Sequence, residues 1–484
     1  MTKIILNGRE VEADPKKPLI AACHEHAENV PMYCYHPGLT PVGSCRICQV
    51  EVKMGETPPR VVVACRTPIV EGMVVDTDAP KAHAARRECL EFLLKNHPLD
   101  CPICDKAGEC DLQDYAFMEG QGEGRTNEPR RKLEKRKDLG DVIVLDQERC
   151  ILCSRCVRFM EEVPKSPQLT VAGLGSRSVI TTFMDRPLSG NYQGNLADVC
   201  PVGALTLKPF RFQARVWNLT KSLSTCAECS RGCSVTVEVL RGGEVKRFRP
   251  RYDPEVNGYW MCDTGRFAFE HTGAEDRLEG ARMRGYSGFE PAEVEDALAL
   301  ASDMLATHAD PLLVASPFMT VEEAAAARQL ADELGARALF VSPEPNELAD
   351  DLLHTGDPCP NRRGLEQAGF EAAGPAAALE AVDACGIAIL CGERVAELLG
   401  REALAELPAE KRMIVFDAHA LDVPASVVCI AVPIHVEKTG TWINVDGHAG
   451  RLSVARRAPA RVEPLTRSLD RLRELARGTG VGRA

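Results

Sequence analysis

The sequence has no hydrophobic run long enough to cross a membrane, since its longest apolar stretches, such as Gly386 to Cys391, fall far short of the roughly 20 residues that span a bilayer. It also lacks an excess of basic residues over acidic ones. Its net charge is -12, and nucleic-acid binding needs a basic surface to neutralise phosphate. The start, MTKIILNGRE, lacks the apolar core of a secretory signal. We therefore expect a chain that is neither exported nor membrane-spanning, with no nucleic-acid partner, and any membrane role must be peripheral.

A glycine-rich loop that could cradle the phosphates of a nucleotide is missing, and so is a flavin motif. The nearest candidate, Gly173-Leu174-Gly175, has no third glycine and does not open a predicted helix. We predict a turn at this position. The chain is therefore not expected to have a substrate-binding catalytic site of its own.

Cysteine, by contrast, is abundant and unevenly distributed. Of the 21 cysteines, 17 lie within residues 1–262, and many are two or three positions apart. Dense cysteines in a chain without an export signal are typical of metal binding rather than of a disulfide framework. The spacing defines four candidate metal-ligand sets: Cys34, Cys45, Cys48 and Cys65; His97, Cys101, Cys104 and Cys110; Cys150, Cys153, Cys156 and Cys200; and Cys226, Cys229, Cys233 and Cys262.

The first and third sets have the most specific spacing. The first set, C-x10-C-x2-C-x16-C in a β-rich region, resembles plant-type [2Fe-2S] sites except for its longer first gap. Gly43 suits a loop whose backbone approaches inorganic sulfide closely. The third set, CILCSRC with a distant Cys200-Pro201, resembles the [4Fe-4S] run of ferredoxins, with Met160 where their fourth cysteine stands. Iron-sulfur clusters fit both sets, and zinc is the alternative, which is weakest for the third set.

The second and fourth sets are less distinctive by themselves. Three cysteines with a histidine also form a common structural zinc set, and the C-x2-C-x3-C-x28-C spacing of the fourth set fits a zinc ribbon. The neighbouring sets favour [4Fe-4S] clusters, because closely spaced redox centres suit electron transfer and zinc has no redox chemistry. We therefore expect one [2Fe-2S] and three [4Fe-4S] clusters. The remaining cysteines are expected to be small buried hydrophobic residues: Cys23, Cys89, Cys359, Cys385, Cys391 and Cys429.

Apolar and polar residues alternate in short runs over residues 1–78, which predicts a small β-rich unit with one helix, over 18–26. Its strands are expected at 3–6, 10–12, 47–53, 61–65 and 73–76. Helical spacing follows over 80–118 and is broken at His97-Pro98. Residues 119–141 are rich in glycine and then in charge, which is typical of a linker.

From about residue 290, helical and β-like runs alternate, which predicts an α/β layer with a largely parallel sheet. The helical runs are 294–309 and 321–334, and the β-like runs are 312–315, 338–341, 386–390, 413–416 and 427–432. Residues 451–484 carry nine arginines against three acidic residues, with a short helical pattern at 465–475. A solvated tail is the expectation there, and a docking tail for a partner is the alternative.

The order of the four sets resembles the large (G-type) iron-sulfur subunit of respiratory complex I, the NADH:quinone oxidoreductase. The resemblance rests on the first two sets, on CILCSRCVRF with DVCPVGAL, and on CAECSRGC with the distant Cys262. It covers residues 1 to about 275. Further on, VEKTGTWINVDGHAGR (436–451) is similar to the E-x-x-G-T-x-x-N-x-x-G motif that this subunit shares with the molybdopterin oxidoreductases.

The resemblance implies a multi-domain α/β chain. Its domains would be a β-grasp [2Fe-2S] ferredoxin-like domain (1–78), a His/Cys-ligated [4Fe-4S] domain (79–118), a charged linker (119–141), a [4Fe-4S] ferredoxin-like domain (142–213), a [4Fe-4S] molybdopterin-oxidoreductase-like domain (214–275), a degenerate α/β domain of the same type (276–455) and an Arg-rich tail (456–484). Because only 222 residues follow Cys262, this last α/β domain is shorter than in the family, and no molybdopterin is expected.

For function, the resemblance implies an electron-transfer subunit of NADH:quinone oxidoreductase, a translocase of the respiratory chain. Electrons would arrive from a flavin-bearing NADH-oxidising subunit, pass through the first three sets and leave to smaller ferredoxin-like subunits, with the fourth set off this path. Such a subunit lies on the cytoplasmic side of the inner membrane as a peripheral part of the complex. The alternatives are an electron-transfer subunit of an NAD-linked hydrogenase, which the fourth set disfavours, and a formate dehydrogenase, which the short last domain disfavours.

Overall fold

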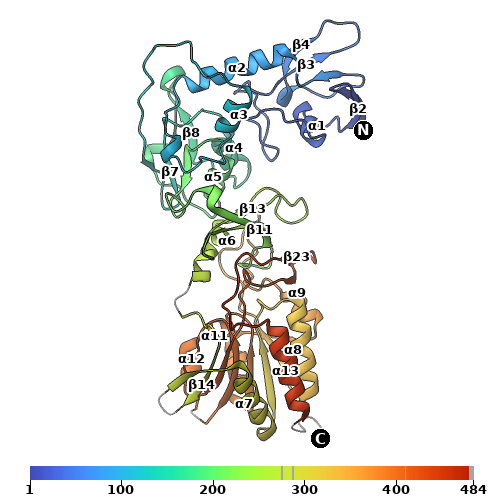
Figure 1. The fold of residues 1–484 in the computed structure, drawn as a ribbon, viewed down its shortest axis with the longest axis vertical. Helices are drawn as coiled ribbons and strands as arrows, with labels where there is room; N and C mark the ends of the chain where they lie inside the picture. Colours follow the sequence, from blue (N-terminus) through green and yellow to red (C-terminus); the bar gives the residue numbers. More distant parts are fainter. Residues whose placement is uncertain (274–275, 286–287, 409, 479–484) are drawn as a thin grey trace. The chain divides into compact units, whose positions relative to one another are not determined.

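The computed structural model describes residues 1–273, 276–285, 288–408 and 410–478. These residues form two compact units that divide between Asn218 and Leu219 (Figure 1). Within the described ranges, no helix combines the length and the apolar character that crossing a bilayer requires.

Unit 1, residues 1–218, begins with a five-stranded sheet of order β2-β1-β5-β3-β4. Its elements are β1 (Thr2–Leu6), β2 (Arg9–Ala13), α1 (Leu19–Glu25), β3 (Gln49–Lys53), β4 (Arg60–Val63) and β5 (Val74–Asp76). Strands β1, β3 and β5 alternate buried and more exposed side chains, and α1 buries Leu19, Ile20 and Cys23 in the same apolar cluster as Val50 and Val75. The predicted strands and helix are confirmed, except that the fourth strand ends at Val63, because Ala64–Arg66 form a 3-10 turn.

The rest of unit 1 has short elements joined by long loops. They are α2 (Pro80–Leu94), α3 (Asp111–Glu119), β6 (Lys137–Asp138), β7 (Ile143–Leu145), α4 (Arg155–Glu162), β8 (Leu169–Ala172), β9 (Val179–Thr182), α5 (Asn195–Val199) and β10 (Leu205–Leu207). Helix α2 ends three residues before His97-Pro98, as the restricted backbone before proline predicts. The predicted turn is confirmed, because Gly173 (φ +77°) and Gly175 (φ +57°) lie between β8 and β9.

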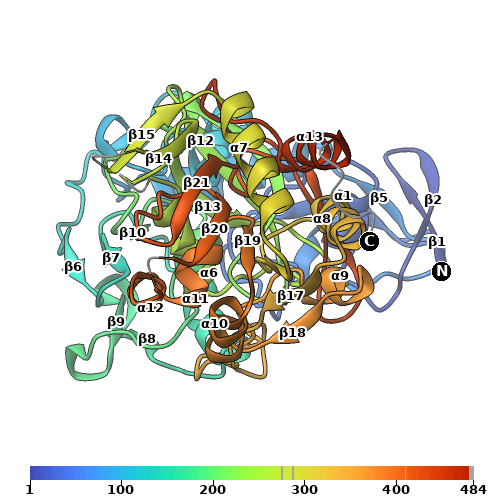
Figure 2. The ribbon, with the colours of Figure 1, turned by 90° about the horizontal axis from the view of Figure 1, so that it is seen from below.

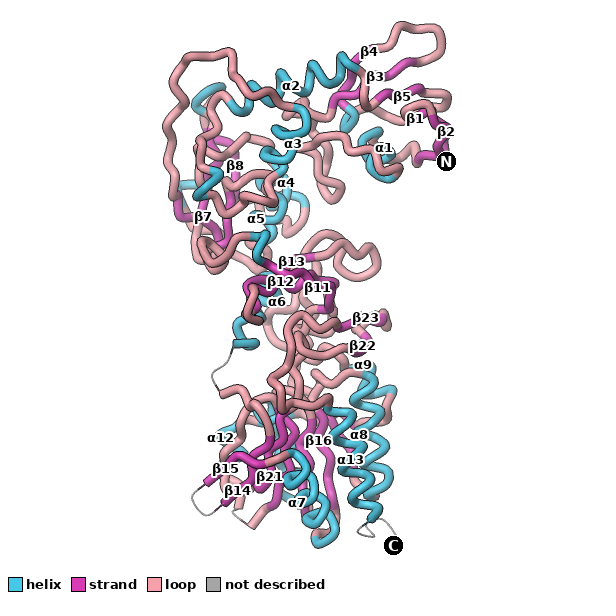
Figure 3. Tube along the Cα trace, in the orientation of Figure 1, coloured by secondary structure: helices cyan, strands magenta, loops and turns pink. Residues whose placement is uncertain are grey.

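Unit 2, residues 219–484, begins with an antiparallel three-stranded sheet of β11 (Leu219–Thr225), β12 (Ser234–Leu240) and β13 (Val245–Pro250), followed by α6 (Asp263–Phe267). Its main part is an eight-stranded sheet of order β15-β14-β21-β20-β19-β16-β17-β18, whose strands are magenta in Figure 3. The strands are β14 (Ala281–Gly285), β15 (Gly288–Ala292), β16 (Pro311–Ala315), β17 (Arg337–Val341), β18 (Glu371–Ala373), β19 (Ile387–Cys391), β20 (Arg412–Asp417) and β21 (Ser426–Ala431). Strands β21 to β18 are parallel, so the predicted parallel α/β layer is confirmed, with β14 and β15 as an antiparallel edge.

Helices cover both faces of this sheet (Figure 2). One face packs against α7 (Val294–Thr307), α8 (Val321–Leu334) and α13 (Leu465–Gly478), and the other packs against α10 (Pro375–Ala384), α11 (Val395–Leu399) and α12 (Arg401–Ala405). Strands buried on both faces read as continuous apolar runs, as in Ile387–Cys391. Helix α8 is delimited by a capping box at Thr320 and Glu323 and by Gly335 (φ +64°).

Helix α13 corrects one expectation. This helix packs against α7 and α8 (Figure 1), and its Leu465, Leu469 and Leu472 are buried in the same apolar cluster as residues of these two helices, so the prediction of a solvated tail is wrong for this segment. Three leucines at helical spacing form an apolar stripe, and arginines flank it, where Arg471 pairs with Glu295 of α7 and Arg477 pairs with Glu333 of α8. Residues 479–484 of the predicted tail lie outside the described residues.

Candidate metal centres

The four cysteines of the first set come together on the loop before β3 and on the turn after β4. Hydrogen bonds join the thiol of Cys34 to those of Cys45 and Cys65, and the thiol of Cys65 to that of Cys48. Backbone N–H groups also donate to the sulfurs, from Cys34 to Cys45 Sγ (3.4 Å) and from Cys65 to Cys48 Sγ (3.5 Å). The hydrogen bonds between the thiols lower the pKa of the Cys34 and Cys48 thiols and raise the pKa of the Cys45 and Cys65 thiols that donate them, so binding a metal through all four sulfurs must release protons. This site fits a [2Fe-2S] cluster.

Gly43 lies in the ligand loop of the first site for two structural reasons. Its φ is +70°, and a Cβ there would lie 2.8 Å from Cγ of Arg66. Any other residue would strain the backbone and push Arg66 away. The predicted need for glycine is therefore explained by the backbone conformation and by the packing of the loop.

The third set lines one small cavity of about 20 Å³. The cavity is bounded by Cys150, Cys153, Cys156 and Cys200 together with apolar side chains such as those of Leu145, Ile180 and Val202. Two non-glycine residues between the ligands, Leu152 (φ +54°) and Ser154 (φ +59°), adopt the left-handed conformation, which folds the chain tightly enough to bring three sulfurs to one side.

Burial shapes the chemistry of this third site. It raises the pKa of the Cys150 thiol to about 12 and that of the Cys153 thiol to about 11, and it also raises the pKa of Cys156. Buried thiols of this kind stay protonated without a metal, so loading a cluster must release protons. The site is enclosed and apolar, which suits a [4Fe-4S] cluster shielded from water.

The cysteines of the second set differ in their exposure. Cys104 and Cys110 are buried, whereas Cys101 is exposed. His97 Nδ1 is buried and has no hydrogen-bond partner among the described residues, and burial, reinforced by the charge of Arg149, lowers the pKa of this imidazole to about 4. A neutral histidine with an unused buried nitrogen is what a metal site requires. These residues fit a His/Cys-ligated metal centre.

The fourth set lies in unit 2, between β11 and α6. The backbone N–H of Cys226 donates to the carbonyl of Cys233 (2.8 Å), and that of Gly265 donates to Cys262 Sγ (3.3 Å). A Cβ on Gly265 would lie 2.8 Å from Cys226 Sγ and 3.5 Å from Cys262 Sγ, so the glycine allows these two sulfurs to converge. Burial and the charges of the neighbouring thiols raise the pKa of Cys233. The four residues fit a compact centre with thiolate ligands.

Among the described residues, no three His, Cys, Asp or Glu side chains lie at the spacing that would hold a single metal ion. The six cysteines outside the four sets follow the prediction in part. Cys23, Cys359, Cys385, Cys391 and Cys429 are buried, but Cys89 is only half-buried and receives a hydrogen bond from Gln49 Nε2 at 3.5 Å.

Sequence reasoning missed the arginines in and beside the third ligand run. Arg149, Arg155 and Arg158 are all buried. Arg149 donates from Nε (3.1 Å) and Nη2 (3.0 Å) to a carboxylate oxygen of Asp100, next to Cys101, and it therefore joins the third site to the second. Three arginines within RCILCSRCVR were a visible signal, because arginine is rarely buried without a specific partner.

The segment 436–451 braces the fourth site. Strands β22 (Gly440–Ile443) and β23 (Ala449–Leu452) form a hairpin, and the Asn444 side chain at its tip donates to the carbonyl of Arg231 at 3.1 Å. Thr225 Oγ1, beside Cys226, donates to the carbonyl of Arg451 at 3.0 Å. A Cβ on Gly450 would lie 2.8 Å from that same Thr225 oxygen, which explains the glycine at position 450, three residues after the motif ends.

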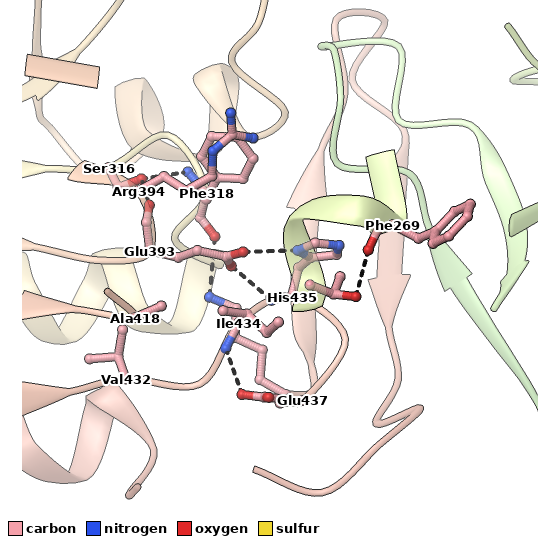
Figure 4. A network of polar contacts seen from close by, with 12 residues as sticks. Phe269, Ser316, Phe318, Glu393, Arg394, Ala418, Val432, Ile434, His435 and Glu437 are labelled. Carbon is pink, nitrogen blue, oxygen red and sulfur yellow. Dashed lines mark hydrogen bonds and ion pairs between the residues drawn. The ribbon is translucent and has the colours of Figure 1, made fainter. Parts of the chain in front are cut away.

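A second feature of unit 2 is a buried polar network at the carboxyl ends of β19 and β21 (Figure 4). Glu393 accepts hydrogen bonds from the backbone N–H of His435 (2.7 Å) and from its Nδ1 (2.9 Å). Burial would raise the pKa of the Glu393 carboxyl, but His435, Lys438 and Arg394 hold it at about 2.

This network borders a cavity of about 220 Å³. Charged side chains in its wall pair with one another, Arg394 with Glu397 (2.8 Å) and Asp276 with both Arg401 (3.0 Å) and His419 (2.8 Å). The network thus ties together the loops that follow the parallel strands.

Four family models match the first part of the chain. They are described as a 2Fe-2S iron-sulfur cluster binding domain (residues 1–80), an NADH-ubiquinone oxidoreductase-G iron-sulfur binding region (86–125), an NADH-quinone oxidoreductase subunit 3 ferredoxin-like domain (140–206) and a molybdopterin oxidoreductase Fe4S4 domain (219–273). Each of the four candidate sites falls within one of these matches.

Similar proteins include the mitochondrial NADH-ubiquinone oxidoreductase 78 kDa subunit of Neurospora crassa, 40% identical over 70% of this chain and 45% of the relative. The mitochondrial NADH dehydrogenase [ubiquinone] iron-sulfur protein 1 of Solanum tuberosum is 36% identical over 70% of this chain and 45% of the relative. A chain in a crystal structure of an NAD+-reducing [NiFe]-hydrogenase has a TM-score of 0.39 and 26% identity, over 44% of this chain and 91% of that chain.

The chain spans less than half the length of these two curated relatives. The matches nevertheless run in the same order as the four sites, and three of the four descriptions name iron-sulfur binding or an Fe4S4 domain. With its four cysteine-rich sites in this order, the chain belongs to the family of large, G-type iron-sulfur subunits of NADH:quinone oxidoreductase.

Proposed function

We propose that this chain is the iron-sulfur electron-transfer subunit of an NADH:quinone oxidoreductase and relays electrons from a flavin-bearing NADH-oxidising subunit toward quinone. The observation that carries the proposal is the buried hydrogen bonding between the three sites of unit 1, which share one compact unit. When bound, the clusters supply one-electron redox chemistry. The residues of the chain hold the ligands, exclude water and keep the sites close to one another.

The ligands in this proposal are the four sets in full. The first holds a [2Fe-2S] cluster and the other three hold [4Fe-4S] clusters, with His97 as the one non-cysteine ligand. Neither flavin nor molybdopterin is part of the proposal. In this proposal the chain transfers electrons within the translocase and has no substrate site of its own.

The third site is the proposed centre of the route. Arg149 and Arg158 flank the ligand run of the third site. Arg149 donates to Asp100, next to the second site, and Arg158 donates to the carbonyl of Cys34 in the first site. A second contact supports the same arrangement, because the backbone N–H of Asp111, next to Cys110, donates to the carbonyl of Pro201, next to Cys200, at 3.0 Å. We therefore order the electron path as first, third and then second site, after which electrons leave to a smaller ferredoxin-like subunit.

The fourth site is proposed to be structural. Its ligands belong to unit 2, and they are braced there by the hairpin of residues 440–452. The α/β region is proposed to be a degenerate molybdopterin-oxidoreductase-like domain. This chain would lie on the cytoplasmic side of the inner membrane, as a peripheral subunit of the membrane-bound complex.

The test is metal and sulfide analysis of anaerobically purified protein, together with electron paramagnetic resonance after reduction with NADH in the complex. Iron and acid-labile sulfide in nearly equal amounts, with little zinc, are expected, and the signals of the first three sites should appear on reduction. Stoichiometric zinc in place of iron would refute the electron-transfer function.

A further inference from the structure

Helix α4 presents one face to the loop that carries the first ligand of the first site. Arg155, Arg158 and Glu162 are three and four positions apart and therefore lie on the same side of the helix. Arg155 Nη2 donates to the carbonyl of Tyr35, and the backbone N–H of Thr40 donates to Glu162 Oε2 at 2.8 Å. The helix that begins within the third ligand run thus holds the loop of the first site.

Arg158 reaches ligand residues of both sites. Its Nη2 donates to the carbonyl of Cys34, and the same nitrogen lies 3.5 Å from the carbonyl of Cys153. Its Nη1 donates to the carbonyl of Thr40 at 2.6 Å. One guanidinium nitrogen therefore joins the backbone of a first-site ligand residue to the backbone of a third-site ligand residue.

Among the described residues, the acceptors around Arg158 are backbone carbonyls and the Ser154 hydroxyl. Arg158 is 7% exposed, and in the part of the chain that the structure describes it makes no ion pair with a carboxylate. Burying an unpaired cation is costly. Clusters with thiolate ligands carry negative charge and would supply the missing compensation.

We propose that Arg158 is a positioning residue that bridges the first and third sites and speeds electron transfer between them. The inference rests on the proposed function, since both sites must hold iron-sulfur clusters. The step moves one electron from the first cluster, which is oxidised, to the third, which is reduced. Electron tunnelling weakens steeply across empty gaps, so a side chain that hydrogen-bonds both ligand residues shortens the path and fixes its length. The buried positive charge also favours the reduced form of both clusters.

The experiment compares Arg158→Met and Arg158→Lys with a matched control, Arg136→Met, in the assembled NADH-oxidising complex. Arg136 also belongs to unit 1, but its side chain is exposed and it is outside the four ligand sets. Three quantities are measured for each protein: the amount of each cluster by electron paramagnetic resonance, the midpoint potentials of the first and third clusters, and the rate of the step between them by freeze-quenching after a pulse of NADH.

With Arg158→Met, both clusters should be present at wild-type amounts, both midpoint potentials should fall, and the step should slow about tenfold, which corresponds to about 1.4 kcal/mol in its barrier. Arg158→Lys keeps the positive charge but lacks the planar guanidinium that donates to several carbonyls. Its midpoint potentials should therefore be closer to the wild-type values than its transfer rate is. Arg136→Met should transfer electrons at close to the wild-type rate.

Two results would overturn the inference while leaving the proposed function intact. One is a wild-type rate in Arg158→Met with both clusters present. The other is loss of a cluster in both Arg158 variants, because the residue would then be needed for assembly rather than for transfer. Absence of the two clusters from the wild-type protein would instead overturn the proposed function itself.

Discussion

The two units of this protein are stabilised in different ways. Unit 2 has an eight-stranded sheet between two layers of helices, with a large apolar cluster on each face. Unit 1 has sheets of at most five strands among its described residues, and cysteines of its first site, Cys48 and Cys65, belong to the same apolar cluster as the strands. A core that includes metal ligands gains part of its folding free energy from the bound metal. Ligand cysteines also belong to a core cluster in unit 2, where Cys226 and Cys233 lie with Phe248 beside the β11–β13 sheet. The comparison therefore teaches that cluster ligands form part of the core around the smaller sheets, whereas the eight-stranded sheet relies on ordinary hydrophobic burial.

The two units also differ in how many large hydrophobic side chains they expose. The most exposed large hydrophobic side chains of the described residues lie in unit 1, among them Leu174 (88%), Phe117 (85%) and Leu99 (81%). Large exposed apolar groups are typical of surfaces that other proteins cover. Unit 1 is therefore proposed to carry the contacts with electron-transfer partners, whereas unit 2 is expected to be more self-contained.

The largest expected effect distinguishes a site that transfers electrons, in unit 1, from a site that stabilises the structure, in unit 2. Cys153→Ser should abolish electron transfer from NADH to quinone, because electrons pass through the cluster of the third site on the proposed path. Cys229→Ser should lower the yield or thermal stability of the complex but leave turnover per bound flavin close to normal. Turnover of both assembled variants, normalised to flavin, checks this. If the Cys229 variant is as inactive as the Cys153 variant, the fourth site lies on the path.

Removal of iron should affect the units unequally. After anaerobic chelation, limited proteolysis of the full chain is expected to cut throughout residues 1–218, because burial keeps the emptied thiols protonated and the loops lose their cross-links. The eight-stranded sheet of unit 2 should survive, since its core contains no proposed ligand. Peptide mapping by mass spectrometry gives the pattern, with untreated protein as the control. Equal loss of both units would contradict the comparison.

A core substitution in unit 2 should destabilise that unit alone. Phe416, in the middle of the sheet, has no exposed surface, so Phe416→Ala should reduce the free energy of unfolding by about 3–5 kcal/mol through lost burial and a cavity. Hydrogen exchange of the sheet amides in denaturant measures this change. Leu348→Ala, at a position that is 47% exposed, is the control and should cost less than about 0.5 kcal/mol. A shift in the cluster signals of unit 1 would argue against independent units.

The smallest expected effect is a pH dependence in unit 1. Hydrogen bonds to Glu119 and then Asp78 raise the pKa of His83, whose ring nitrogens lie 2.6 Å and 2.7 Å from these carboxylates. Because the folded-state pKa is raised, the stabilisation is fully present below about pH 6.5 and is lost as pH rises through the folded-state value. His83→Gln should lower the unfolding temperature of unit 1 at about pH 6 and have little effect at about pH 9. A difference that grows with pH would have the wrong sign.

Local pattern predicted much of the fold. The alternation of residues 2–6 and 9–13 is found as the β1–β2 hairpin, and the apolar runs from Pro311 to Ala431 are found as the parallel strands. The tail was misjudged because its arginines outnumber its leucines, and composition does not reveal that Leu465, Leu469 and Leu472 share one face of a helix that packs against α7 and α8.

The sequence by itself determined which residue types can bind metal and in what order they occur, because ligand spacing is a local property of the chain. It did not determine which sites lie next to each other. The adjacency of the first and third sites depends on Arg158 meeting the carbonyl of Cys34, a residue 124 positions away. Contacts over such separations follow from how helices and loops pack, so only the tertiary structure decided that the third ligand run joins the other two sites of unit 1, with its buried arginines as the links.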